Sequence, residues 1–495
     1  MKRILALSLL LALLLTGCSG AHGSEPEAVT LTYYTIGEPD RDLKRVNDAL
    51  NELLFPRYGF RVEYRKIGWN EYESRLSTLV NTNQSFDIAF TWAGNYQSIA
   101  AQGKWLDLTP YLETSGSAMY RAIDEKFWKG VVVDGKICGV PTNKELGTPM
   151  QFLFDRRLVE KYDIDISDYT TLASLEPLLR MISEREPDYI PFFLDSTQYN
   201  FMLPAGYEYI TYDTIPLVIR SDDPECRVVN PFETKGIMDE LYLMHRYYTL
   251  GYINQDACIR TSLSRFEGEK VFLRIARGGP DADASYTGTF GYPIVVQQAS
   301  ASVATTDSTR GGIMAVNAAT KHPEQCVAFL NAVNTDTDVR NLLNYGIEGV
   351  HYTLTDAGQV HVTSDAYAGV TYTQGNWFLL RTREDENPDR WEIFKEFNEA
   401  TQESALLGFV PDYSGHALQF DKIARIYERY NSALITGTVS PRGNVEQMNR
   451  ELADAGLAEL QAALVIVKIP ASCPSRGAPR GARDRRLCKR TGQSR

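Results

Sequence analysis

Aromatic side chains, with amides and carboxylates near them, are the residues of this chain best suited to binding chemistry. The sequence holds 28 Tyr, 20 Phe and 6 Trp, which make 11% of the chain aromatic. A flat ring covers an apolar C–H face and fixed polar groups hydrogen-bond a rim of hydroxyls, so this combination suits a sugar. Seven residues are candidates for such a ligand site: Glu38, Trp69, Trp92, Asn95, Asn143, Glu145 and Trp377.

Catalytic motifs are missing from the sequence. It has no HExxH, no GxSxG and no strand-following GxGxxG, and its six histidines are dispersed. We therefore expect no enzyme, no cofactor and no metal. Carboxylates are nevertheless plentiful, and a glycoside hydrolase needs only two that face each other at about 5–9 Å. A secreted glycoside hydrolase is thus an alternative that the sequence leaves open.

The first third of the chain predicts the elements that would position these residues. Strand patterns over 29–36, 60–67 and 86–91 alternate with amphipathic helix patterns over 43–53 and 72–80. This order is typical of a parallel sheet with crossover helices. Ligands of open α/β sheets lie beyond the carboxyl ends of the strands.

Three of the candidates stand at that edge. Trp92 follows the third strand, Trp69 lies between the second strand and its helix, and Glu38 follows the first strand. Each has a simpler interpretation as well. A tryptophan of an α/β protein often belongs to the core, and Glu38 could begin a helix, where a carboxylate meets the positive end of the dipole.

The later sequence continues the mixture of strands and helices. Strand patterns cover 270–275 and 311–316, and helix patterns are centred on 326–333, 391–407 and 423–434. We find no internal repeat and no long linker. One compact body with two α/β lobes is the most economical prediction.

Composition excludes several classes of function. The chain has 495 residues and a formal net charge of −12, with 43% hydrophobic and 23% charged residues. These fractions are ordinary for a globular protein and exclude general disorder. The acidic balance argues against nucleic acid as the main partner. No apolar run after the N-terminus reaches the ~20 residues that span a bilayer.

The N-terminus resembles an export and anchoring signal. Lys2 and Arg3 precede an apolar run over 4–15, as in a signal peptide. The following Leu-Thr-Gly-Cys sequence resembles the lipobox of bacterial lipoproteins, which implies lipidation of Cys18. Small and polar residues over 19–27 are typical of a flexible tether. We expect the protein on the extracellular face of the cell membrane, or facing the periplasm if there are two membranes, held only by this lipid.

Five segments together resemble the family 1 extracellular solute-binding proteins, in the subgroup with an extra C-terminal domain of unknown function. The resemblance extends over about 28–465. The segments are DIAFTW at 87–92, GVPTNKE at 139–145, FDRRLVEKY at 154–162, KHPE at 321–324 before AFL at 328–330, and NYGIEGVHY at 344–352.

The resemblance implies a type II periplasmic-binding-protein fold, with two α/β lobes, a hinge, an interlobe cleft and a helical C-terminal extension. Asn143 and Glu145 would flank a crossover between the lobes, where Lys144 and Glu145 could instead form a hinge ion pair. The implied domains are a signal peptide (1–17), a tether (18–28), lobe 1 (29–145 and 300–346), lobe 2 with the C-terminal domain (146–299 and 347–467) and a tail (468–495).

The resemblance also implies a role in import. Such a protein would capture a small molecule and deliver it to the permease subunits of an ABC importer, whose ATPase is a separate chain. No GxxxxGK[ST] motif occurs here. The tryptophans favour a carbohydrate, most simply an oligosaccharide, while peptides, amino acids and polyamines stay as alternatives. We expect a monomer that binds no nucleic acid.

The tail from 468 to 495 differs from the preceding sequence. It holds nine Lys or Arg, one acidic residue and no aromatic residue. One interpretation is a basic arm for an anionic polymer or a membrane surface. We favour the other, that this segment is a non-native extension, because an exported and anchored protein has little use for such an arm. We expect it to be disordered.

Overall fold

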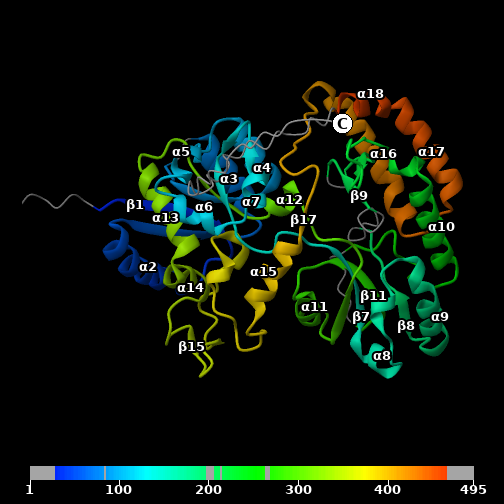
Figure 1. Ribbon diagram of the computed structural model, residues 1–495, viewed down its shortest axis with the longest axis horizontal. Coiled ribbons are helices and arrows are strands. Elements are labelled where there is room, and N and C mark those ends of the chain that lie inside the picture. Colours follow the sequence, from blue (N-terminus) through cyan, green and yellow to red (C-terminus); the bar gives the residue numbers. More distant parts are fainter. Residues whose placement is uncertain (1–27, 83–84, 197–205, 212–213, 262–267, 465–495) are drawn as a thin grey trace, which may run out of the picture.

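The computed structural model describes residues 28–82, 85–196, 206–211, 214–261 and 268–464. In this part the chain forms two lobes of helices and sheet, which stand side by side in Figure 1. Each lobe has its own large hydrophobic core. The two-lobed α/β fold expected from the sequence is therefore confirmed. The signal peptide, Cys18, the tether up to residue 27 and the basic tail lie outside the described residues.

The sheet of the first lobe has five strands in the order β2-β1-β3-β14-β6. β1 pairs in parallel with β2 and β3, whereas β14 runs antiparallel to its neighbours β3 and β6. The strand β14 thus returns from far along the chain into the middle of this sheet. The strands are β1 (Thr30–Ile36), β2 (Arg61–Ile67), β3 (Ile88–Thr91), β6 (Gly139–Pro141) and β14 (Ile313–Val316).

Helices of the first lobe pack on the sheet through apolar stripes. In α2 (Leu43–Tyr58) the buried residues Val46, Leu50 and Leu54 recur every four positions, on one face of the helix. The other helices are α3 (Tyr72–Asn81), α4 (Ala93–Ala101), α5 (Thr109–Leu112), α6 (Ser117–Ala122), α7 (Glu125–Gly130), α12 (Thr306–Thr309), α13 (Pro323–Thr335) and α14 (Thr337–Tyr345). A short hairpin joins β4 (Val132–Val133) to β5 (Lys136–Ile137).

The sheet of the second lobe has four strands in the order β12-β7-β11-β8. All six residues of β7 are buried, because both faces of this central strand are covered. The strands are β7 (Met150–Asp155), β8 (Tyr189–Phe192), β11 (Lys270–Arg277) and β12 (Ile294–Gln298), with a separate pair β9 (Tyr207–Tyr209) and β10 (Val218–Arg220). The helices are α8 (Arg156–Lys161), α9 (Glu176–Arg185), α10 (Lys235–Thr249) and α11 (Ala282–Phe290).

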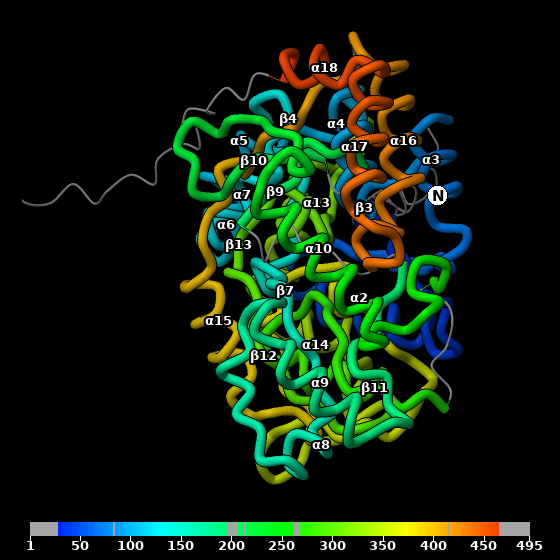
Figure 2. Tube along the Cα trace, turned by 90° about the vertical axis from the view of Figure 1, so that its right-hand side faces the viewer, coloured from blue at the N-terminus to red at the C-terminus, as the bar shows by residue number. Residues whose placement is uncertain are grey.

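Three C-terminal helices complete the second core. They are α16 (Ala417–Ile435), α17 (Pro441–Asp454) and α18 (Leu457–Ala463). Ile423, Tyr427, Met448 and Leu460 are buried in the same hydrophobic cluster as α10. In Figures 1 and 2 these helices lie at the top of the second lobe, at the opposite end from α8. The C-terminal region is thus built into the second lobe.

Three segments cross between the lobes and are hydrogen-bonded to one another. The backbone N–H of Leu146 donates to Asn398 Oδ1 (2.7 Å), and Asn398 Nδ2 donates to the carbonyl of Lys144 (2.8 Å). The short strands β13 (Val303–Ala304) and β17 (Gln402–Glu403) pair in parallel. Together these segments form a three-stranded hinge.

Residues 347–400 pack differently from the sequence-based prediction, which assigned them to the second lobe. Tyr367 is buried in the first core, and Tyr372 packs against it. Helix α15 (Arg390–Ala400) buries Trp391 in a cluster with Tyr345 of α14. This segment belongs with the first lobe because its aromatic side chains find their partners there. It also holds the hairpin β15 (Tyr352–Leu354) and β16 (Val360–Val362).

Most expected elements occur within a few residues of their predicted bounds. One helix is shorter than predicted, because α15 ends at Ala400 and the pattern over 391–407 continues as the hinge strand β17. The cysteines Cys138, Cys226, Cys258 and Cys326 are free thiols in the described part of the chain. No helix in that part is long and apolar enough to cross a membrane.

Candidate functional site at the lobe interface

An aromatic row runs along the carboxyl edge of the first sheet. The ring of Trp92 stacks on Phe90 at 5.6 Å, Phe90 meets Tyr372 edge-on at 6.1 Å, and Tyr372 lies 6.2 Å from Trp69. In Figure 1, β1 starts at the outer side of the first lobe, so its carboxyl end points toward the second lobe. The row therefore lies at the edge where an open α/β sheet binds its ligands.

A pocket of about 470 Å³ at one end of this row brings together Glu38, Trp69 and Trp377 with residues 368–372. We call it the aromatic pocket. Trp69 is 47% exposed, which is unusual for so large an apolar side chain. Glu38 accepts a hydrogen bond from the backbone N–H of Trp69 (3.3 Å). Helix α2 begins only at Leu43, so Glu38 does not begin a helix.

Two buried cations, Lys66 and Arg340, donate hydrogen bonds to the backbone of residues 368–377, a segment that we call the strap. Lys66 Nζ forms an ion pair with Asp40 (2.7 Å) and donates to the carbonyl of Ala368 (2.9 Å). Arg340 Nη2 and Trp377 Nε1 both donate to the carbonyl of Thr371 (2.9 and 3.0 Å). Burial lowers the pKa of Arg340 to about 10, so the guanidinium stays charged at neutral pH.

A second and larger pocket, of about 850 Å³, lies between the lobes, and we call it the interlobe cleft. From the first lobe it is lined by Ala93, Gly94 and Gln97 of α4. The hinge segments 298–308 and 402–406, the second lobe around 206–211 and the C-terminal segment 409–420 complete its walls. Its size falls within the range of small-molecule pockets.

Arg310 fixes the wall that the first lobe contributes to the cleft. Its Nη1 donates to Gln97 Oε1 (2.8 Å), and its Nε and Nη2 donate to the carbonyls of Gly130 (2.6 Å) and Val132 (3.1 Å). Burial lowers the pKa of Arg310 from its ordinary value. With its donors used in this way, Arg310 positions the Gln97 amide at the cleft.

The seven predicted residues fall into three groups, which lie in the aromatic row with its pocket, on helix α4 and in the hinge. Glu38, Trp69 and Trp377 meet in the aromatic pocket, and Trp92 belongs to the aromatic row. Asn95 donates to Glu73 (3.3 Å) on the neighbouring helix α3.

The third group belongs to the hinge. Asn143 is 4% exposed and donates to Ala122 O and Asn376 Oδ1. Glu145 forms the anticipated ion pair with Lys144 (2.6 Å).

Several lining residues were not identified from the sequence. Tyr372 comes from the strap, and Tyr209, Phe409, Tyr413 and Phe420 come from the second lobe and the C-terminal region. They stand in segments without strong strand or helix periodicity or at the start of a helix. No local pattern showed that they would face Gln97 or Trp69.

An ion pair joins the two lobes beside the hinge. Arg390 of α15 donates to Asp281 (2.5 Å), which stands between β11 and α11 of the second lobe. The same guanidinium pairs with Glu386 of its own lobe. The guanidinium also lies over the Trp391 ring at 4.7 Å. The two lobes are therefore linked by the Arg390–Asp281 ion pair as well as by the backbone of the hinge.

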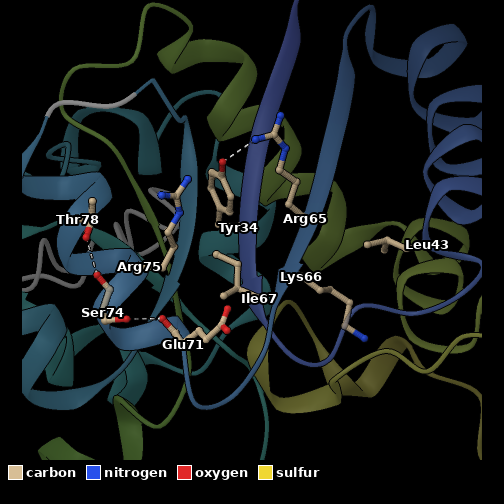
Figure 3. A pocket seen from close by; sticks show the side chains of 9 residues that line it. All are labelled: Tyr34, Leu43, Arg65, Lys66, Ile67, Glu71, Ser74, Arg75 and Thr78. Atoms are coloured by element: carbon tan, nitrogen blue, oxygen red, sulfur yellow. Dashed lines mark hydrogen bonds between the residues drawn. The ribbon is translucent and has the colours of Figure 1, made fainter.

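A further hollow, of about 590 Å³, lies on the first lobe near Tyr34 of β1, the edge strand β2 and α3 (Figure 3). Arg65 Nη1 donates there to the hydroxyl of Tyr34 (2.6 Å), and Arg75 stands nearby on α3. Aromatic platforms of the kind that line the aromatic pocket and the interlobe cleft are fewer here. The described residues contain no group of three or more His, Cys, Asp or Glu placed to hold a metal ion.

Comparison with known proteins gives two family matches. Residues 49–206 match the model of the bacterial extracellular solute-binding proteins. Residues 405–465 match a domain of unknown function, DUF3502. The second match begins just after the hinge strand β17 and covers the three C-terminal helices.

A curated relative and solved structures resemble the chain over most of its length. A carbohydrate ABC transporter substrate-binding protein of Streptococcus pneumoniae serotype 4 is 26% identical over 452 residues, which cover 90% of this chain and 91% of the relative.

The crystal structure of the N-glycan transport solute binding protein NgtS from S. pneumoniae is 25% identical and has a TM-score of 0.79, over 88% of this chain and 97% of that one. Its complex with Man5GlcNAc, 26% identical over the same shares, has a TM-score of 0.64. With the fold described above, these matches show that the chain is similar to bacterial extracellular solute-binding proteins, and that its C-terminal region is similar to DUF3502.

Proposed function

We propose that the protein is the solute-binding component of an ABC importer, and that it captures an oligosaccharide between its lobes and delivers it to the permease. The observation that carries the proposal is the arrangement of the lobes. Two separate cores are joined by a narrow hinge, and aromatic residues gather at their interface. Such an architecture suits closure around a ligand that contacts both lobes.

The relatives support a carbohydrate as the ligand. The S. pneumoniae relative is described as a carbohydrate transporter protein, and NgtS was solved in complex with Man5GlcNAc and Man1GlcNAc. The aromatic pocket, with Trp69 and Trp377 as platforms and Glu38 as an acceptor, has the chemistry that a sugar requires. Peptides, amino acids and polyamines are the competing ligands.

The remaining parts of the proposal concern location and partners. Lipidation of Cys18 would anchor the protein on the extracellular face of the cell membrane. The protein would act there as a monomer and dock on the permease subunits of an importer whose ATPase is a separate chain. The protein itself would change no bond of the ligand. Of the predicted site residues, Trp92 would extend the platform of the aromatic pocket, and Asn143 and Glu145 would serve the hinge. Asn95 would bind ligand only by leaving Glu73.

A thermal-shift screen tests the ligand class. Man5GlcNAc, Man1GlcNAc, a peptide mixture, amino acids and spermidine are added separately to the purified protein. At a hundredfold excess over Kd, a ligand that binds only the folded state adds about 2.7 kcal/mol of stability. We expect a rise in Tm with a glycan, and the glycan recovered intact. A rise only with peptides or spermidine would overturn the carbohydrate assignment, and a cleaved glycan would indicate a hydrolase.

A further inference from the structure

The C-terminal domain contributes a wall of the interlobe cleft. Phe409, Tyr413 and Phe420 line this cleft together with Ala93 and Gln97 of the first lobe. The rings of Tyr413 and Phe420 lie 4.6 Å apart, and the Tyr413 hydroxyl is 2.5 Å from Thr211 Oγ1 of the second lobe. We call residues 402–420 the C-terminal wall.

Hydrogen bonds attach the C-terminal wall to the hinge. The backbone N–H groups of Gln402 and Ser404 donate to the carbonyls of Ser302 and Ala304 (3.0 and 3.1 Å). Thr306 Oγ1 donates to Leu406 O (3.0 Å) and accepts from the N–H of Gly408 (2.9 Å). The wall is therefore a fixed surface on the hinge and second lobe, across the cleft from α4.

The C-terminal wall and the aromatic pocket are two separate surfaces for a long ligand. The two pockets share no lining residue. They are nevertheless linked by adjacent residues, because Ala93 of the cleft follows Trp92 of the aromatic row. The rings of Phe409 and Tyr413 line the same cleft as the amide of Gln97, so the cleft offers the same combination of apolar face and hydrogen-bonding group as the aromatic pocket.

We propose that the C-terminal wall binds the outer units of an oligosaccharide whose inner units occupy the aromatic pocket. The domain of unknown function thereby selects for ligand size. The inference rests on the proposed function. A short sugar fills the aromatic pocket alone, whereas a larger one also contacts Phe409 and Tyr413. Removal of these rings therefore costs affinity for the larger ligand only.

Calorimetric titration of the intact protein with Man5GlcNAc and Man1GlcNAc tests the inference. We expect Phe409→Ala and Tyr413→Ala each to weaken Man5GlcNAc binding by roughly tenfold, as the loss of one aromatic contact of about 1.4 kcal/mol implies. Man1GlcNAc binding should change by less than about twofold. Tyr413→Phe, which keeps the ring, should retain most of the affinity.

The control is Tyr242→Ala, a 45% exposed tyrosine on α10 that lines neither pocket. Circular dichroism and Tm measurements identify any variant that fails to fold, and Phe409→Ala and Tyr413→Ala serve as independent probes of the same wall. Equal losses for both glycans, or no loss for either, would overturn the role of the C-terminal wall while leaving the importer proposal intact. If the wild-type protein bound neither glycan, the carbohydrate proposal and this inference would both fall.

Discussion

Trp69 offers the most direct residue-level test of the aromatic pocket. It lies at the mouth of this pocket with 47% of its surface exposed, and its ring is 6.2 Å from Tyr372. Trp69→Ala should weaken glycan binding by roughly tenfold, or about 1.4 kcal/mol, because one stacking platform is lost. Titration calorimetry measures the change. Trp69→Phe should restore part of the affinity.

An aromatic residue far from either pocket serves as the control for that experiment. Phe55 is 40% exposed on α2 and lines neither the aromatic pocket nor the interlobe cleft. Phe55→Ala should leave the affinity unchanged. Equal affinities of the wild type and Trp69→Ala would contradict our placement of the ligand.

Asp336 caps α14 and links it to α2. Its Oδ1 accepts from the backbone N–H groups of Asp338 (3.0 Å) and Val339 (3.3 Å), and its Oδ2 accepts from Arg57 (2.8 Å) and Tyr58 (2.9 Å). Burial raises the pKa of this carboxyl, but the hydrogen bonds from Arg57 and Tyr58 outweigh burial. The pKa therefore lies below its ordinary value of 3.8.

Asp336→Ala should lower the free energy of unfolding by about 1–2 kcal/mol at neutral pH, as expected for a lost N-cap. Because the pKa is depressed in the folded state, the charge contributes stability above the ordinary value of 3.8 and loses that contribution as the pH falls through the folded-state pKa. Urea unfolding near pH 7 and about pH 3 measures the difference, which should shrink in acid. Asp338→Ala, at an exposed partner of the same Arg57, is the control.

Several single residues were predictable from the sequence because a strand end placed them. Trp69, Trp92 and Glu38 were proposed because each follows a strand whose end could be identified, and Trp377 because a glycine precedes it by two residues. Asn143 was predicted to bind ligand; it lines a pocket of about 770 Å³, and its amide donates to Ala122 O and Asn376 Oδ1. That pairing joins residues 233 positions apart, and no local pattern shows such a contact.

At the scale of elements, the strap depends on its close approach to β14. A Cβ added to Gly312 would lie 2.2 Å from the carbonyl oxygen of Tyr372 and 2.9 Å from Thr142 Oγ1. Thr142 itself donates to that carbonyl (3.1 Å). A side chain at Gly312 would therefore push the strap, and Tyr372 with it, away from the sheet.

Gly312→Ala should destabilise the fold by about 1–3 kcal/mol, the usual cost of overpacking. It should also weaken glycan binding, because Tyr372 would shift relative to Trp69. Chemical unfolding and calorimetry measure the two effects. The matched control is Gly288→Ala in α11, where an added Cβ meets nothing within 4 Å. That change should be neutral or stabilising by about 0.5–1 kcal/mol, since alanine favours a helix. A neutral Gly312→Ala would contradict the argument.

Regular elements were predictable because their side-chain periodicity is local. The first three strands and the helices α2, α3 and α16 all appear where alternation, a short apolar run or helical spacing of apolar residues indicated them. The assignment of 347–400 to a lobe was not predictable in this way. It depends on which core receives Tyr367 and Trp391, and tertiary packing decides that.

At the scale of the whole molecule, the relative position of the lobes is expected to change on binding. The TM-score is 0.79 to the NgtS structure first described above, but 0.64 and 0.67 to the NgtS complexes with Man5GlcNAc and Man1GlcNAc. We expect a bound glycan to draw the lobes together and lower the radius of gyration in small-angle X-ray scattering. An unchanged radius at saturating glycan would contradict hinge closure.

The position of β14 between β3 and β6 also has a consequence for the order in which the molecule folds. The first core needs Ile313–Val316, and the second needs residues from Leu406 to Leu464. The first core can therefore close only after Tyr372 has been synthesised, and the second only after α18 (Leu457–Ala463) has been. Contacts between such distant segments form slowly, so the apolar residues of the second core stay accessible to chaperones for longer than those of the first.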